Sequence, residues 1–276
     1  MFLLSCKRSG RSYSKETLHN IESIHYQEND SLKKVKTISH DSLIRQPILK
    51  SLISCENPYL KSGELITHTY YELQYSEEHE QAYWVAYVLY PDLLIKNAAR
   101  KNRFIEDNQV KTGSASLTDY KGSGFDRGHM APAGAMVVNQ TAMNESFYMS
   151  NMSPQHPSFN RGVWKRLESK VKTWAKDSDS LFVVTGPILN LIEKTIGDNH
   201  VSVPKQFYKV LVRFKDKEIS GIAFLLKNEK SKKHLNTFAV TIDSIEELTG
   251  IDFNPNWGIK TENIIEGKID INAWHF

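Results

Sequence analysis

Residues 119–168 indicate both the fold and the chemistry of this chain and read DYKGSGFDRGHMAPAGAMVVNQTAMNESFYMSNMSPQHPSFNRGVWKRLE. The stretch holds an imidazole (His129), an arginine (Arg127), two amides (Asn151 and Asn160) and a carboxylate (Glu168). Metal-assisted cleavage of a phosphodiester uses such groups: a base that makes hydroxide, oxygen ligands for a hard cation, and positive charge for the transition state. The stretch therefore predicts a nuclease-like site.

The composition is that of an ordinary soluble globular protein. The chain has 276 residues, of which 40% are hydrophobic and 24% charged, and this length allows one large core or two small ones. No apolar run approaches the roughly 18 residues that span a bilayer. The net charge of +3 permits a polyanionic partner but does not by itself indicate one.

The first 56 residues are mostly polar and lack sustained periodicity. They are typical of a leader or tether before a folded domain at 57–276, and an N-terminal arm packed on that domain is an equal alternative. Leu3-Leu4-Ser5-Cys6 resembles the lipobox at which bacterial lipoproteins are cleaved and lipidated. Because the flanking signal is incomplete, either the match is accidental or the precursor is longer. We favour the longer precursor, with a lipid anchor at Cys6.

The two cysteines, Cys6 and Cys55, form no CxxC pair. This excludes a structural zinc site of the cysteine type. A disulfide between them stays open, because sequence alone does not decide cysteine pairing.

The first half of the domain predicts strands followed by an irregular segment. Two aromatic and β-branched runs, 65–75 and 82–90, are joined by a polar linker and predict a hairpin. Residues 97–120 are polar and irregular, and residues 139–148 favour a short helix.

A helix is predicted from Ser158, which is a plausible N-cap. Asn160 and Glu168 would then lie eight residues apart, about 80° around the helix axis and roughly 12 Å along it, so both could border one groove. The alternative is that Asn160 is only a first-turn residue and Glu168 a surface partner of Lys172. The apolar face of this helix is formed by Trp164, Leu167, Val171 and Trp174.

The second half of the domain is mainly β. Strands are predicted at 181–189, 207–214, 219–227 and 236–242, and a short helix at 243–248 with Gly250 at its end. Strands and helices follow one another without a βαβ rhythm. The expected fold class is therefore α+β, with a mainly antiparallel sheet flanked by helices.

Six segments in order resemble the DNA/RNA non-specific endonuclease family, the ββα-metal nucleases. The resemblance covers residues from about 58 to 255, and the leader is outside it. The segments are DRGH (126–129), SNMSPQ (150–155), FNRGVWKRLE (159–168), VVTGP (183–187), VPKQFYKV (203–210) and IEELTGIDFNP (245–255).

The resemblance implies a role for each site residue. His129 matches the general base that activates water, and Asn160 the direct ligand of one Mg²⁺, for which Mn²⁺ could substitute. Glu168 matches the carboxylate that holds the waters of this ion, with Asn151 behind it. Arg127 matches a phosphate-contacting or orienting arginine, and Arg103 an upstream arginine that stabilises the transition state. Lys172 departs from the pattern, since some members carry an arginine at this position.

The resemblance also implies the partners, DNA and RNA, cleaved with little sequence preference. It leaves open a homodimer, an inhibitor protein, and two other functions: nucleic-acid binding without catalysis, or hydrolysis of small phosphodiesters. The unperturbed imidazole pKa of roughly 6.5 places the titration of His129 near working pH. Because such an enzyme in the cytoplasm would attack its own host, the expected location is the bacterial envelope, the periplasm or outside the cell.

Overall fold

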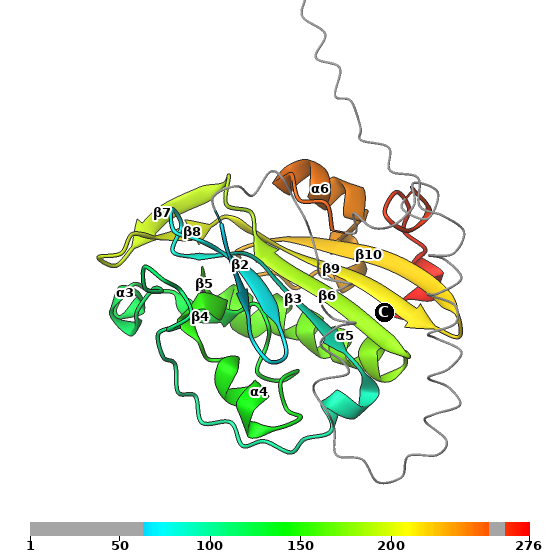
Figure 1. The fold of residues 1–276 in the computed structure, drawn as a ribbon. Helices are drawn as coiled ribbons and strands as arrows, with labels where there is room; N and C mark the ends of the chain where they lie inside the picture. The colour runs from blue at the N-terminus through cyan, green and yellow to red at the C-terminus, as the bar shows by residue number, and fades with distance from the viewer. Residues whose placement is uncertain (1–62, 254–262) are drawn as a thin grey trace, which may run out of the picture. The chain divides into compact units, whose positions relative to one another are not determined.

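The structure is a computed structural model that describes residues 63–253 and 263–276. The expected leader, the anchor at Cys6 and the Cys6–Cys55 pair fall outside these residues. The described chain folds around a seven-stranded sheet with the order β1-β2-β3-β6-β9-β10-β11 (Figure 1). Every neighbouring pair in it is antiparallel. The expected α+β class with a mainly antiparallel sheet is confirmed.

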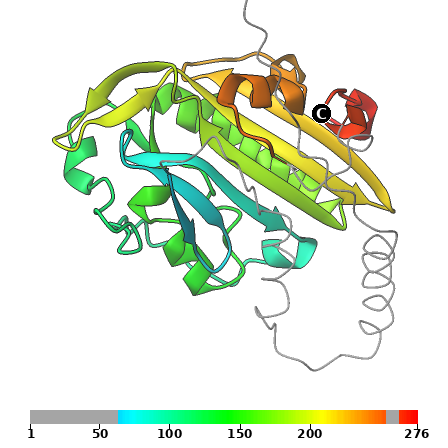
Figure 2. The ribbon, with the colours of Figure 1, turned by 45° about the horizontal axis from the view of Figure 1, so that its top comes forward.

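The strands of this sheet are β1 (Glu64–Thr67), β2 (Glu72–Ser76), β3 (Gln81–Leu89), β6 (Ser180–Pro187), β9 (Gln206–Lys215), β10 (Glu218–Lys227) and β11 (Ala239–Val240). Alternate residues of a strand face opposite sides of a sheet. In β9, Phe207 and Leu211 join a hydrophobic cluster with α5 (Lys165–Lys176), whereas Val210 and Val212 join another with α6 (Ile242–Thr249). Figures 1 and 2 show α5 and α6 on opposite faces of the sheet.

Some predicted elements differ in length from those in the structure. The run 65–75 is interrupted by a turn, in which the His68 N–H donates to the Tyr71 carbonyl, and forms β1 and β2 instead of one strand. The run 236–242 forms only the two-residue β11, because the 3-10 turn η4 (Leu235–Phe238) precedes it and Thr241 caps α6. The predicted end of α6 is confirmed, since Gly250 is left-handed at φ 71°.

The residue pattern did not predict two antiparallel ribbons. One joins β4 (Asp126–His129) to β5 (Met152–Gln155) and, with the helix α5 that follows, forms the ββα motif that the family resemblance implies. The other joins β7 (Ile192–Ile196) to β8 (Val201–Pro204). The predicted helix near 139–148 is confirmed as α4 (Gln140–Glu145). The remaining short helices are η1 (Pro91–Leu94), α3 (Leu117–Tyr120), η2 (Met149–Asn151), η3 (Phe159–Trp164) and η5 (Ile271–Ala273).

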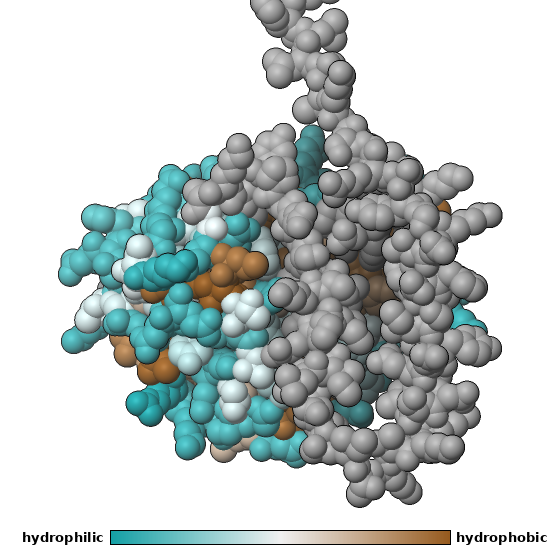
Figure 3. Space-filling model, viewed as in Figure 1, coloured by the Kyte–Doolittle hydropathy of each residue, from teal (hydrophilic) through white to brown (hydrophobic). Residues whose placement is uncertain are grey.

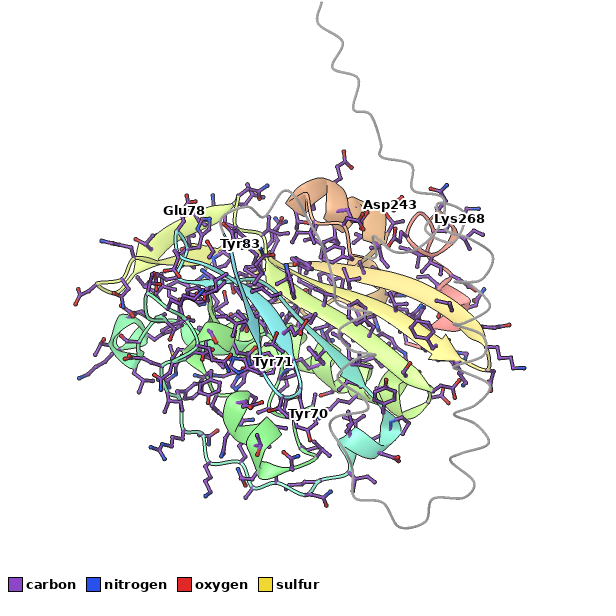
Figure 4. All side chains as sticks on the ribbon, viewed as in Figure 1. Tyr70, Tyr71, Glu78, Tyr83, Asp243 and Lys268 are labelled. Carbon is purple, nitrogen blue, oxygen red and sulfur yellow. The ribbon has the colours of Figure 1, made fainter. Side chains whose placement is uncertain are left out.

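Two tyrosines tie the β1–β2 turn to α4, as Figure 4 shows by their position beside it. Tyr70 accepts a hydrogen bond from Asn139, whose side chain caps the start of α4. Tyr71 donates to the carbonyl of Glu145, at the end of α4. The sheet edge and the segment that follows the DRGH motif are therefore held together.

Most coloured side chains on the face in Figure 3 are hydrophilic, and hydrophobic ones form small separate groups. Within the part of the chain that the structure describes, no helix combines the length and the apolar character needed to cross a bilayer.

Candidate active site

A cleft of about 870 Å³ lies beside the β4–β5 ribbon and the helical segment that follows it. His129, Arg127, Asn160 and Glu168 all line this cleft, so the structure brings these four predicted residues together. Its acidic side chains are Asp126 and Glu168. Its basic side chains, apart from His129, are Arg100, Lys121, Arg127, Arg161, Lys165 and Lys172. The cleft therefore suits an anion.

His129 stands in an aromatic cluster on the cleft wall. Its ring meets Phe147 edge-on at 5.0 Å between centroids, and Phe104 lies 5.7 Å away. Although the residue as a whole is half-buried, its Nε2 atom is sealed from solvent and finds no partner in the described chain. Nδ1 is thus the nitrogen left to meet a water in the cleft.

Burial, followed by the charges of Arg100 and Arg127, lowers the pKa of His129 to about 3. This pKa lies well below the unperturbed value near 6.5 from which the sequence analysis starts. The imidazole is neutral throughout the physiological range, which is the form that accepts a proton.

Two guanidinium groups flank the aromatic cluster. The Cζ atom of Arg127 lies 4.2 Å from the centroid of the Phe104 ring, and that of Arg100 lies 5.4 Å from the centroid of the Phe147 ring. A guanidinium stacked on a ring keeps its N–H donors free for an anion. Both arginines line the cleft and so offer positive charge close to His129.

Gly128 has a steric role in the motif. A Cβ atom placed on it would come within 2.2 Å of Cδ and Oε1 of Gln155, the residue at the end of β5. Gln155 is fully buried, so it cannot move out into solvent. Only glycine lets β5 approach β4 this closely beneath His129.

Asn151 does not line the cleft but holds the backbone that directly follows His129 through hydrogen bonds. Its Oδ1 accepts from the Ala131 N–H at 2.8 Å, and its Nδ2 donates to the carbonyls of Ala131 and Ser146 at 2.9 and 2.8 Å. Its own carbonyl accepts from the Met130 N–H. Asn151 is fully buried and so fixes the backbone two residues after His129.

Asn160 forms a hydrogen bond with Asp126, which the sequence did not single out. The Asn160 Nδ2 donates to Asp126 Oδ2 at 2.9 Å, and the Arg161 guanidinium donates to both oxygens of the same carboxylate. Burial alone would raise the pKa of Asp126, but the hydrogen bonds from Arg161 and Asn160 lower it below its usual value. Because the amide nitrogen faces Asp126, the Asn160 Oδ1 atom is left as an oxygen donor in the cleft.

The helix that carries Asn160 starts with a wide π turn, η3. The Lys165 N–H donates to the Asn160 carbonyl, five residues back, and Ser158 already has helical dihedral angles and makes no capping bond. The prediction of a regular helix capped by Ser158 is therefore wrong. Gly162 inside this segment has non-helical dihedral angles (φ −106°, ψ −109°), so the chain is kinked there and positions 160 and 168 do not share one regular helix. Both residues nevertheless line one cleft.

Glu168, on α5, lies above a buried lysine. Burial raises the pKa of Glu168, and the nearby cation of Lys209 acts most strongly in the opposite direction. Lys209 is fully buried, donates to Thr185 Oγ1 at 2.5 Å and lies 4.8 Å from the centroid of the Trp164 ring. Burial lowers the pKa of Lys209, and the Glu168 carboxylate raises it. Each charge thus favours ionisation of the other.

The structure does not place Arg103 in the cleft lining. Its side chain is exposed, and Arg100 lines the cleft instead. Sequence reasoning missed Asp126, Arg100 and Lys209 as site residues. Lys209 had a usable signal, because it is the single charge within the apolar run 207–212, and a charged residue there is rarely buried without a reason.

Comparisons with known proteins agree with this geometry. The family described as DNA/RNA non-specific endonuclease matches residues 50–258. Human mitochondrial endonuclease G is 34% identical over 209 residues, which cover 70% of each chain. Nuclease C1 of Cunninghamella echinulata var. echinulata is 35% identical over 208 residues, which cover 69% of this chain and 82% of that protein. A nuclease of Nostoc sp. is 32% identical over 219 residues, covering 75% and 78%.

A solved structure is also similar to this chain. It is the EndoG chain of an EndoG/EndoGI complex, described in terms of the mechanism of EndoG inhibition. The TM-score is 0.72 with 29% sequence identity, and the match covers 84% of this chain and 99% of the other. The family match, the sequence identities and the fold agree, and the chain belongs to the DNA/RNA non-specific endonuclease family.

Proposed function

We propose that the protein is a metal-dependent endonuclease that hydrolyses phosphodiester bonds of DNA and RNA, with His129 as general base. The observation that carries the proposal is the placement of a neutral imidazole, an amide oxygen and a half-buried carboxylate in one cation-rich cleft. The relatives of this chain are named as nucleases, which supports the same reaction class.

The proposed chemistry divides between two sides of the cleft. On the β4 side, the neutral His129 accepts a proton from water at Nδ1, and the resulting hydroxide attacks phosphorus. The bond from phosphorus to one ester oxygen then breaks, and that oxygen leaves as a hydroxyl after taking a proton from water. Arg127 and Arg100, stacked on Phe104 and Phe147, are placed to meet the negative charge that develops on the phosphoryl oxygens.

The donors on the helix side suit Mg²⁺. Asn160 Oδ1, the Asp126 carboxylate and the Glu168 carboxylate are hard oxygen donors, and there are few of them. Mg²⁺ prefers oxygen ligands and keeps several waters. Asn160 would bind such an ion directly, Glu168 would hold its waters, and Asp126 would orient the Asn160 amide. A bound cation would supply charge stabilisation at the phosphate.

Specificity follows from the groups that line the cleft. Most of the charged ones are arginines and lysines, which suit phosphate, and contacts to phosphate carry no sequence information. We therefore expect both DNA and RNA to be cut with little sequence preference, and increasing salt to weaken binding as phosphate contacts are screened.

The test is digestion of a plasmid and of a long RNA by the full chain, with Mg²⁺ and with EDTA. The proposal expects cleavage of both substrates at many sites, abolished by EDTA. A single dominant cut site on the plasmid would contradict non-specificity, and full activity in EDTA would contradict metal dependence.

One variant tests the metal ligand. Asn160→Ala removes the oxygen proposed to bind the cation directly, so the Mg²⁺ concentration for half-maximal activity should rise at least about tenfold, since even indirect contacts to a metal site cost 10- to 100-fold. Metal titration of initial rates measures this. Asn108→Ala, an exposed asparagine outside the cleft, is the matched control. An unchanged Mg²⁺ requirement in Asn160→Ala would remove Asn160 from the metal site.

A further inference from the structure

A second cavity adjoins the active-site cleft along α5. It measures about 530 Å³ and shares Arg100, Ala133, Gly134, Ser169 and Lys172 with the cleft. Since the same residues form part of both walls, the two cavities adjoin, and a chain-like ligand bound at His129 can extend along these residues to the second cavity.

The charge of this second cavity is entirely positive. Lys96, Arg100, Lys172 and Lys176 line it, and no aspartate or glutamate does. Lys96 and Lys176 are exposed, and neither forms an ion pair with an acidic residue of the described chain. By contrast, Lys111 pairs with Glu64 and Lys215 with Asp177. Within the described chain, therefore, no acidic side chain neutralises Lys96 or Lys176, and the charge of this cavity is available to an anionic ligand.

The spacing on α5 adds to this argument. Lys172 and Lys176 lie one helical turn apart, about 6 Å along the axis and on the same side. Like charges at this spacing destabilise a helix by a few tenths of a kcal/mol. An extended polyanion lying along the helix would remove this repulsion at both positions.

The floor of the cavity is apolar, formed by Leu94, Ala98, Val137 and Met143. The two hydroxyls in the lining are already engaged as donors to helix carbonyls: Ser169 donates to Lys165, and Thr173 donates to Ser169. The apolar side chains suit the bases and sugars of a nucleic-acid strand, and the lysines suit its phosphates. Nothing in the lining is placed to distinguish one base from another.

We propose that this cavity, which we call the lysine subsite (Lys96, Lys172 and Lys176), binds the nucleic-acid strand next to the phosphodiester that is cut. The inference rests on the proposed nuclease function and extends it: the substrate is a strand long enough to fill both cavities, and a single phosphodiester reaches only the first. The subsite contacts phosphates, so it raises affinity without selecting a sequence.

The test compares a long substrate with a minimal one. The double variant Lys96→Gln/Lys176→Gln removes the two lysines of the subsite that line the second cavity alone, and Lys230→Gln/Lys232→Gln makes the same charge change at exposed positions outside both cavities. The substrates are single-stranded DNAs of 4 to 24 nucleotides and bis(p-nitrophenyl) phosphate. In the wild type, KM should fall with strand length until both cavities are filled.

For the subsite variant, KM on the longest strand should rise roughly five- to twentyfold at about 0.1 M salt, and the gain with length should largely disappear. Losing two phosphate contacts on a single strand should also reduce the slope of log affinity against log salt by about 1.4. The readout is the increase in KM on the long strand divided by the increase in KM on the small diester. The control variant should match the wild type in both.

Two results would overturn the proposal: a subsite variant with unchanged KM on all strand lengths, or equal losses on the long strand and the small diester. Fluorescence anisotropy of a labelled 24-mer in the His129→Ala background measures the same contacts without cleavage. If the wild type cleaved nothing while this binding still depended on Lys96 and Lys176, the nuclease function would fail and the subsite would stand.

Discussion

His129→Ala should lower kcat by at least about two orders of magnitude, the usual contribution of a positioned acid–base group. The reason is that Nδ1 of His129 is the proton acceptor in the cleft, and a methyl group cannot replace it. Binding of nucleic acid and the Mg²⁺ requirement should stay within about twofold of wild type, because the phosphate and cation contacts belong to other residues. Single-turnover rates, anisotropy and metal titration measure the three quantities.

His234→Ala, which changes an exposed histidine outside the cleft, is the control and should behave as wild type. If His129→Ala instead raised the Mg²⁺ requirement with little loss of kcat, His129 would act as a metal ligand and the assignment of the base would be wrong.

The pH profile gives a second readout of the same assignment. Because burial and two arginines lower the His129 pKa to about 3, this group does not titrate between pH 8 and 5. A fall in kcat/KM as pH decreases through that range belongs to Glu168, whose pKa burial raises and which is active as a carboxylate. The fall in kcat/KM at low pH should disappear in Glu168→Gln and persist in the residual activity of His129→Ala. If it disappeared in His129→Ala and persisted in Glu168→Gln, His129 would be the group that titrates.

Asn151→Ala should lower stability more than activity per folded molecule. The substitution leaves the N–H of Ala131 and the carbonyls of Ala131 and Ser146 without their buried partner. With three unsatisfied groups at about 1–3 kcal/mol each, the loss is at least about 3 kcal/mol, a large part of the 5–15 kcal/mol typical of a folded domain. Urea unfolding and thermal melts should show it, the Tm falling by roughly 10–20 °C.

Asn144→Ala, at an exposed position on α4, is the matched control and should change stability by less than about 0.5 kcal/mol. An Asn151→Ala protein that melts like wild type but needs far more Mg²⁺ would show that Asn151 serves the metal site, as the family resemblance implies, and that the clamp matters little.

Features that depend on a local residue pattern were predicted well from the sequence. The apolar runs at 181–189, 207–214 and 219–227 became β6, β9 and β10, because continuous apolar side chains suit strands covered on both faces. The end of α6 was also predictable, because Gly250 is a glycine and a glycine adopts the left-handed conformation without strain.

Features set by distant partners could not be predicted. Asp126, Arg127, Gly128 and His129 have weak strand propensity, and β4 exists because β5, more than twenty residues later, pairs with it. The kink at Gly162 in η3 has no periodicity signal, because one residue with non-helical dihedral angles does not change the spacing of the apolar residues. Both features determine which way the site residues face.

Lys209 has a consequence for anyone who redesigns this protein for heat resistance. It is a fully buried cation that donates to one hydroxyl, lies over one indole ring and interacts with the Glu168 carboxylate. Removing one partner of a buried charge pair typically costs about 3–5 kcal/mol, because the other charge is left uncompensated. Methionine at position 209 alone would therefore lower both the stability of the fold and the ionisation of Glu168. Only a simultaneous apolar replacement of Glu168 could stabilise the fold, and it would remove the carboxylate from the cleft, so thermal stability and turnover oppose each other at this pair.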